Sequence, residues 1–210
     1  HKPGKVAVSA DPAGDGVDPA VASGIQRAAD ALANSGYQVE EITPPAVAEI
    51  AQQWGRILST ETAEMLKPVI DEHGSESAAK AIGYMLDTFG TLALGDYMRA
   101  QADRTRLVRD WLTFLEQYPL LLVPVSQEPP MPVNDDLKGL TRMKEILTAQ
   151  KMLVAVNFLG LPAAAVPTGI NNGVPMGVQL VATRYREDVA LDAAEAIENE
   201  TGVMTRQLWS

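Results

Sequence analysis

The sequence contains no cysteine and only two histidines, and these shortages exclude several kinds of site. Without thiols there is no disulfide framework, no cysteine-based zinc site and no thiol nucleophile. His1 stands at the N-terminus and His73 lies in a polar stretch without a G-x-S-x-G elbow, so neither a two-histidine metal site nor a Ser-His-Asp triad is predicted. We therefore expect no metal ion and no cofactor.

Positive charge is also scarce, since 17 lysines and arginines stand against 27 aspartates and glutamates, for a net charge of −10. A surface of this sign repels phosphate backbones and anionic lipid headgroups, so neither nucleic acid nor a membrane is expected as a partner. No apolar run approaches the roughly 18 residues expected of a membrane span. The sequence predicts a soluble protein, and the absence of cysteine is compatible with the cytoplasmic location that we expect.

What the N-terminal part does contain is a β-α-β pattern. Residues 4–11 alternate valine with small or polar neighbours, which predicts a short strand. Asp18 and Pro19 suit the N-cap and first position of a helix that Gly36 ends, and residues 37–42 read as a second strand. Such a unit is the building block of an α/β sheet.

Residues 46–118 are mostly helical in pattern and resemble a helical insertion, with breaks expected near Lys67-Pro68, residues 72–77 and Gly90. The last helix of this region, about residues 95–118, carries several arginines. These arginines lie three and four residues from aspartates, which is typical of a solvated helix face rather than an anion site.

The C-terminal part predicts further strands and helices. Residues 119–125 form a continuous apolar run bounded by prolines, as in a strand buried on both faces, and one helix is expected over residues 140–159. Two strands joined by an Asn172-Gly173 turn follow, and residues 186–202 predict a closing helix. The simplest α/β architecture is a mixed β-sheet covered by helices, in a single domain over residues 1–210.

The most patterned stretch is "NFLGLPAAAVPTGINNGVPMGVQLVA", residues 157–182, which contains no acid, histidine or serine. Together with "RDWLTFLEQYPLLLVPV" (109–125) and "GKVAVSADP" (4–12), it resembles the C-terminal portion of the amidase signature family. The matching residues that we single out are Asn157, Gly160, Leu161, Pro162, Pro167, Gly169, Pro175, Gly177 and Gln179.

This resemblance implies hydrolysis of carbon–nitrogen amide bonds. Family members use a serine nucleophile, a second serine in a cis peptide and a lysine, with a Gly-Gly-Ser-Ser-type loop that supplies oxyanion donors. The present chain has no Gly-Gly pair and no Ser-Ser pair, so no catalytic residue is assigned to it. The family places these parts upstream, and the chain begins at His1 without a methionine. We expect a C-terminal amidase portion that is inactive alone, whose partners are an N-terminal catalytic portion and a small-molecule amide.

The alternative function is a free-standing, non-catalytic binding or regulatory module derived from an amidase. In either case Ser126 and Gln127, which follow a predicted strand, are candidates for the edge of a substrate pocket, because loops at strand ends commonly form such sites.

The 157–182 stretch is expected to act as scaffold. Gly160 would end a helix, and Pro162 and Pro167 would bound a buried strand. If the sheet continues into another portion, some strand edges are left unpaired here, which would favour self-association.

Overall fold

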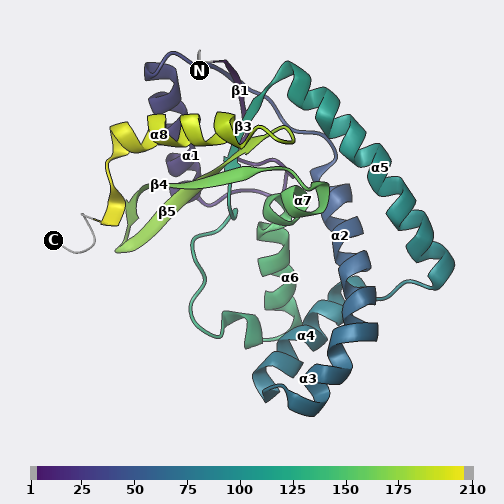
Figure 1. Cartoon of the computed structure of the whole chain (residues 1–210). Coiled ribbons are helices and arrows are strands. Elements are labelled where there is room, and N and C mark those ends of the chain that lie inside the picture. Colours follow the sequence, from purple (N-terminus) through teal and green to yellow (C-terminus); the bar gives the residue numbers. More distant parts are fainter. Residues whose placement is uncertain (1–3, 206–210) are drawn as a thin grey trace.

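The computed structural model describes residues 4–205, which form a five-stranded mixed sheet covered by helices (Figure 1). The strand order is β2-β1-β3-β5-β4, in which β1 pairs in parallel with β2 and β3, while β5 runs antiparallel to β3 and β4. The strands are β1 (Lys5–Val8), β2 (Gln38–Glu41), β3 (Leu120–Pro124), β4 (Ala163–Asn171) and β5 (Val174–Ala182). The expected mixed α/β architecture is therefore confirmed.

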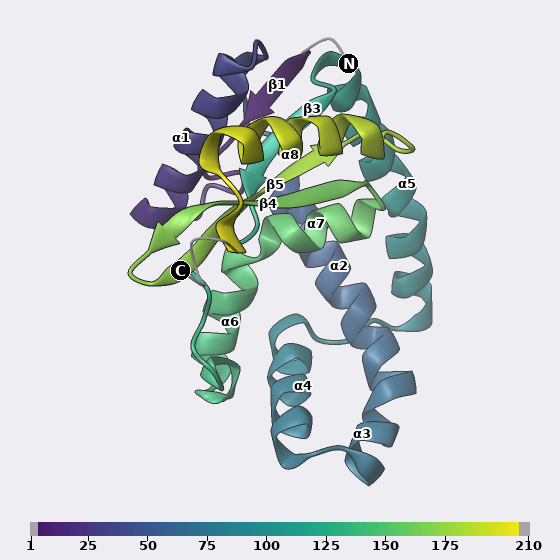
Figure 2. The ribbon, with the colours of Figure 1, turned by 60° about the vertical axis from the view of Figure 1, so that its left-hand side comes forward.

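Helices cover both faces of the sheet (Figures 1 and 2). One face packs its apolar side chains against α1 and α8, and the other packs against α2, α5 and α7. The α-helices are α1 (Pro19–Asn34), α2 (Val47–Glu61), α3 (Lys67–His73), α4 (Glu76–Phe89), α5 (Leu94–Gln117), α6 (Leu140–Ala149), α7 (Lys151–Leu159) and α8 (Glu187–Thr201). A π-helical turn η1 (Thr62–Leu66) and a 3₁₀ turn η2 (Asp135–Leu137) complete the elements.

The predicted β-α-β unit is present at the N-terminus. The Asp18 carboxylate accepts a hydrogen bond from the Ala20 N–H at 2.8 Å, and Pro19 is the first residue of α1, as expected for a capped helix start. The apolar face of α1, which includes Ile25 and Leu32, is buried against the sheet. β2 then pairs in parallel with β1.

Two predicted helix boundaries are wrong. No break occurs at Lys67-Pro68, because the chain passes through η1, where the Lys67 N–H bonds to the Thr62 carbonyl five residues back. A π-turn of this kind keeps the chain helical next to a proline that cannot donate. Conversely, the helix predicted over 140–159 is divided at Gln150, where the Ala149 carbonyl accepts the N–H of Gln127 from a distant loop.

The patterned stretch after α7 begins with the expected glycine stop. Gly160 has φ 66° and ψ 45°, its N–H bonds to the Asn157 carbonyl, and the Leu161 N–H bonds to the Val156 carbonyl, which together make a Schellman motif. Asn172 (φ 49°) and Gly173 (φ 79°) form the predicted turn between β4 and β5.

The prediction that Pro162 and Pro167 bound a buried strand is wrong. Pro162 does precede β4, but Pro167 lies inside it, beside a register shift between Pro167 and Gly169. Within the described residues β4 is an edge strand, and Ala163 and Ala165 are exposed. A proline is tolerated there because edges and bulges do not need every backbone donor.

Candidate substrate-pocket wall

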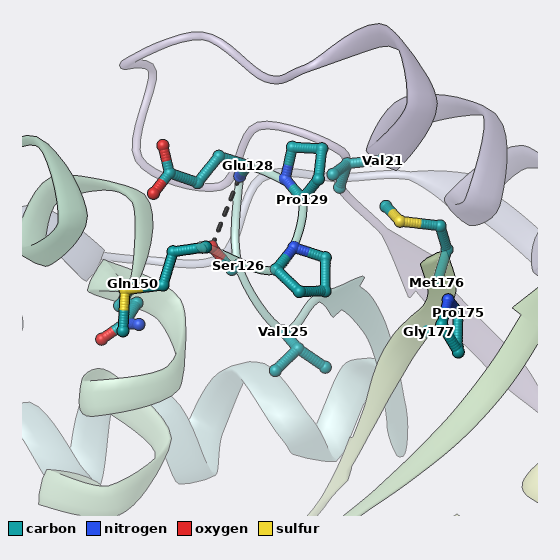
Figure 3. A pocket seen from close by; sticks show the side chains of 11 residues that line it. Val21, Val125, Ser126, Glu128, Pro129, Gln150, Pro175, Met176 and Gly177 are labelled. Carbon is teal, nitrogen blue, oxygen red and sulfur yellow. Dashed lines mark hydrogen bonds between the residues drawn. The ribbon is translucent and has the colours of Figure 1, made fainter. Parts of the chain in front are cut away.

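A cavity of about 280 Å³ lies where the chain leaves β3, at the C-terminal end of this central strand (Figure 3). The pairing of Pro124 with Val178 explains its position, because the residues that follow β3 then lie beside those that precede Val178 in β5. The lining residues are Val21, Val125, Ser126, Glu128, Pro129, Pro130, Met131, Gln150, Pro175, Met176 and Gly177. Four segments distant in sequence thus share one cavity.

Ser126, one of the two residues selected from the sequence, lines this cavity. Its hydroxyl oxygen accepts a long hydrogen bond, 3.4 Å, from the Glu128 N–H (Figure 3). Glu128 is the one titratable residue in the cavity lining, and its carboxylate is paired with Arg142 and is not bonded to this hydroxyl. Ser126 is therefore better suited to contact a ligand than to act as an activated nucleophile.

Gln127 is not among the residues that line that cavity. Its side chain is buried, and its Nε2 donates to the Asp11 carboxylate at 2.6 Å and to the Gly16 carbonyl at 2.7 Å. Its backbone N–H and carbonyl bond to Ala149 and Asp18. Gln127 thus ties three segments together, and it lines a neighbouring cavity of about 440 Å³.

The acidic turn that receives Gln127 is itself well ordered by hydrogen bonds. The Asp11 carboxylate accepts from the N–H groups of Gly14, Asp15 and Gly16 at 2.8–3.1 Å. Lys151, at the start of α7, binds the Asp15 carboxylate at 2.7 Å. These contacts hold the turn beside the end of β3.

Charged groups stabilise the loop that forms the outer side of the cavity. Arg142 of α6 binds Glu128 at 2.8 Å and the buried Asp135 at 2.6 Å, and Lys138 also binds Asp135 at 2.6 Å. Hydrogen bonds from Lys138 and then Arg142 hold the pKa of the Asp135 carboxyl below its usual value. The ionised carboxylate therefore contributes to anchoring the loop.

The remaining lining is largely apolar and suits an apolar group with a polar end. Val21, Val125, Met131 and Met176 supply hydrocarbon and thioether surface, while Ser126 and Gln150 supply polar atoms. The sequence pattern does not identify Gln150, because it predicts a continuous helix across this residue. The position of Gln150 at the division between α6 and α7 turns it to the cavity.

The residues of the amidase-like pattern fall into two groups. Pro175 and Gly177 line the cavity. The others shape the scaffold: Asn157 accepts a hydrogen bond at 3.3 Å from the indole N–H of Trp54, which links α7 to α2, and Gln179 is buried within β5. Leu161 is buried beneath the turn that Gly160 makes, and Gly169 lies at the register shift of β4.

Two further features of residues 4–205 concern metal ions and membranes. No group of three or more histidine, cysteine, aspartate or glutamate side chains in this range has an arrangement that could hold a metal ion. In the same range, every helix is too short or too polar to cross a membrane.

Comparison with known proteins gives a consistent match. The Amidase family model matches residues 1–191. An indoleacetamide hydrolase of Bradyrhizobium japonicum is 41% identical over 208 residues, which are 99% of this chain and 45% of that protein. An indoleacetamide hydrolase of Bradyrhizobium diazoefficiens is 40% identical over 208 residues, which are 99% of this chain and 40% of that protein. The chain thus spans less than half the length of these curated relatives.

Solved structures share the fold at lower sequence identity. The crystal structure of an amidase superposes with a TM-score of 0.75 at 22% identity, covering 96% of this chain and 46% of the other. A bacterial aryl acylamidase of the amidase signature family superposes with a TM-score of 0.72 at 20% identity, covering 97% of this chain and 45% of the other. With a family model matching residues 1–191, the chain belongs to the amidase family and corresponds to the C-terminal part of its longer relatives.

Proposed function

We propose that this chain is the C-terminal portion of an amidase that hydrolyses carbon–nitrogen amide bonds, and that the cavity after β3 is one wall of its substrate pocket. The observation that carries the proposal is the meeting of Ser126 with Pro175 and Gly177, two residues of the amidase pattern, around one cavity. The serine nucleophile and lysine come from the N-terminal portion, since the chain has no Ser-Ser or Gly-Gly pair.

The mostly apolar lining supports an amide whose acyl group is apolar. Methionine, valine and proline side chains bury such a group, and the Ser126 hydroxyl and Gln150 amide are placed to orient a polar end. The 41% identity to an indoleacetamide hydrolase supports an arylacetamide as the first substrate to test. In this reaction water cleaves the amide bond and releases a carboxylate and ammonia. The proposed setting is a single domain over residues 1–210 within a cytoplasmic enzyme.

The experiment is a chimera in which residues 1–210 replace the matching C-terminal part of the Bradyrhizobium japonicum indoleacetamide hydrolase. We expect ammonia release from indole-3-acetamide by the chimera and none by the 210-residue chain alone. Met176→Asp places a charge in the apolar lining, so it should raise KM at least about tenfold, as for a buried unpaired charge.

The matched control is Met98→Asp on the exposed surface of α5, outside the cavity lining, which we expect to change KM less than about threefold, because its side chain remains hydrated. A folded chimera that hydrolyses no amide would contradict the proposal and favour the alternative of a non-catalytic module.

A further inference from the structure

Two polar groups of the cavity after β3 lie on segments that are distant in sequence (Figure 3). Ser126 belongs to the loop after β3, whereas Gln150 stands at the division between α6 and α7. Two such groups orient a ligand only if their separation is fixed, since a displacement of about 1 Å is enough to weaken a productive contact. The contacts that hold these two segments together therefore bear on substrate recognition.

The backbone of Gln127 connects both segments. Gln127 follows Ser126 directly, and its N–H donates to the Ala149 carbonyl at 2.8 Å, immediately before Gln150. Its own carbonyl accepts a hydrogen bond at 2.9 Å from the N–H of Asp18. Asp18 is the N-cap of α1, and the first turn of this helix supplies another residue of the lining. Three of the four segments around the cavity thus meet at Gln127.

The side chain of Gln127 holds this meeting point in place. It is 4% exposed, and its Nε2 donates to the Asp11 carboxylate at 2.6 Å and to the Gly16 carbonyl at 2.7 Å. Both neighbours are acceptors, so only one orientation of the amide group satisfies them. The Asp11 carboxylate also accepts from three N–H groups of its own turn. The side chain cannot rotate without breaking both of its hydrogen bonds.

Gln127 does not itself contact a ligand in this cavity. It is absent from the lining, and both acceptors of its amide nitrogen belong to the protein. Any effect of its side chain on substrate binding is therefore transmitted through Ser126 and Gln150, its neighbours along the chain and across the Ala149 hydrogen bond.

We infer that Gln127 is a positioning residue of the substrate pocket, which fixes the separation of the Ser126 hydroxyl and the Gln150 amide. This inference rests on the proposed function and names the residue that sets the geometry of its pocket wall. A purely structural role has a different kinetic signature. Partial unfolding lowers the number of active molecules and hence the apparent kcat, whereas displaced lining groups weaken substrate binding and raise KM.

The first test is Gln127→Leu in the chimera, assayed with indole-3-acetamide at a temperature where circular dichroism shows a folded protein. Leucine is close to glutamine in size and has no donor, so the acidic turn loses its connection to the loop after β3. We expect KM to rise about tenfold, while kcat falls less than about threefold, because the proposed nucleophile lies in the N-terminal portion.

The matched control for a loss of stability is Leu115→Ala. Leu115 is 2% exposed in the core beneath α5 and lies outside the cavity lining. Its truncation leaves a void and destabilises the fold without touching the pocket. We expect KM of this variant to stay within about twofold of the unchanged chimera, with any loss confined to the apparent kcat.

A double-mutant cycle tests whether Gln127 acts through the acidic turn. Asp11→Ala removes the carboxylate that receives the Gln127 amide, so it should also raise KM. Because both substitutions break the same contact, the double variant should raise KM no more than about twice as much as the stronger single variant. Multiplied effects, of about a hundredfold in the double variant, would overturn the inference.

The outcomes separate this inference from the proposed function. An active chimera in which Gln127→Leu lowers only kcat, as Leu115→Ala does, would overturn the inference alone. A folded chimera that hydrolyses no amide would contradict the proposed function, and the dissociation constant of indole-3-acetamide, measured by calorimetry, then takes the place of KM. Binding about tenfold weaker in Gln127→Leu alone would still support the inference. Equal binding in both variants, or none in the unchanged chimera, would overturn it.

Discussion

Gln127 and Gln179 are both more than nine-tenths buried, yet their amide groups have opposite surroundings. The Gln127 Nε2 donates to a carboxylate and to a carbonyl, although its Oε1 accepts no hydrogen bond from the described residues, whereas the Gln179 Nε2 has no acceptor among them. A buried N–H donor with an acceptor stabilises the fold, while one without an acceptor costs free energy through desolvation. The same residue type therefore has a different effect on stability at these two positions.

The substitution of leucine at each position tests this contrast. Gln127→Leu removes two donors from the acidic turn, so we expect the free energy of unfolding to fall by about 2–3 kcal/mol. Gln179→Leu removes a donor that bonds to nothing, so the change should stay within about 1 kcal/mol and favour the variant. Urea denaturation of both variants measures the difference, and a larger loss for Gln179→Leu would contradict it.

The Asp135 carboxylate gives the loop beside the cavity a pH dependence. Its pKa is held below the usual 3.8 by Lys138 and Arg142, so the unfolded state binds this proton more readily than the folded state. The stabilisation is complete above pH 3.8 and is lost as the pH falls through the lowered pKa. Asp135→Asn should reduce the stability of the folded state at pH 7. It should also flatten the decline of stability below about pH 4, close to the ordinary aspartate pKa.

Thermal denaturation at several values between about pH 2.5 and pH 7 checks this prediction, because this range spans the ordinary aspartate pKa. Asp136→Asn is the control, because this neighbouring carboxylate takes part in no ion pair among the described residues. Identical profiles for the two variants would show that the Asp135 contacts do not stabilise the folded state.

At the scale of the element, sequence patterns predicted helices and strands where the signal is local. The Asp18-Pro19 start, the Gly160 stop and the Asn172-Gly173 turn all depend on a few neighbouring residues, and all three are confirmed. The division at Gln150 depends instead on a hydrogen bond from Gln127, more than twenty positions away. Periodicity carries no information about such a contact.

The candidate site was predicted only in part, because local signals identify some of its residues and contacts between distant segments place the others. Ser126 follows a buried strand and lines the cavity, as loops at strand ends commonly do. Gln127 was paired with it because the two are adjacent, but the Gln127 side chain bonds to Asp11 and Gly16 and does not line this cavity. Gln150 was missed because its exposure to the cavity depends on the unpredicted end of α6.

The packing of α4 on α2 gives a prediction for one pair of glycines. A Cβ at Gly55 of α2 would lie 2.2 Å from the Phe89 ring, which also packs edge-on against Trp54 with ring centroids 6.2 Å apart. Gly55→Ala therefore forces the ring away and should cost about 1–3 kcal/mol. Gly83→Ala in α4 meets no atom within 4 Å and should stabilise the helix by up to about 1 kcal/mol.

Chemical denaturation of the two alanine variants distinguishes packing from helix propensity, since both place the same residue inside a helix. Opposite signs are expected. If both variants gain stability, Phe89 adapts freely and the α2–α4 contact is not close-packed.

At the scale of the whole molecule, the net charge of −10 opposes association through an unpaired edge of the sheet. A free edge favours pairing with another chain, and a high charge of one sign opposes the approach of that chain. The balance changes with pH, because protonation of carboxylates reduces the charge toward zero at the isoelectric point of about 4.7.

We therefore expect the 210-residue chain to be a monomer at pH 7.5 in low salt and to self-associate as the pH approaches 4.7. Sedimentation velocity at several concentrations measures this directly. Ala165→Lys should reduce the association near the isoelectric point, because a lysine on an exposed edge opposes strand pairing and adds positive charge. Lys144→Glu on the exposed surface of α6 alters charge away from the edge and serves as the control. A dimer at pH 7.5 that dissociates only in Ala165→Lys would show that edge pairing outweighs the charge.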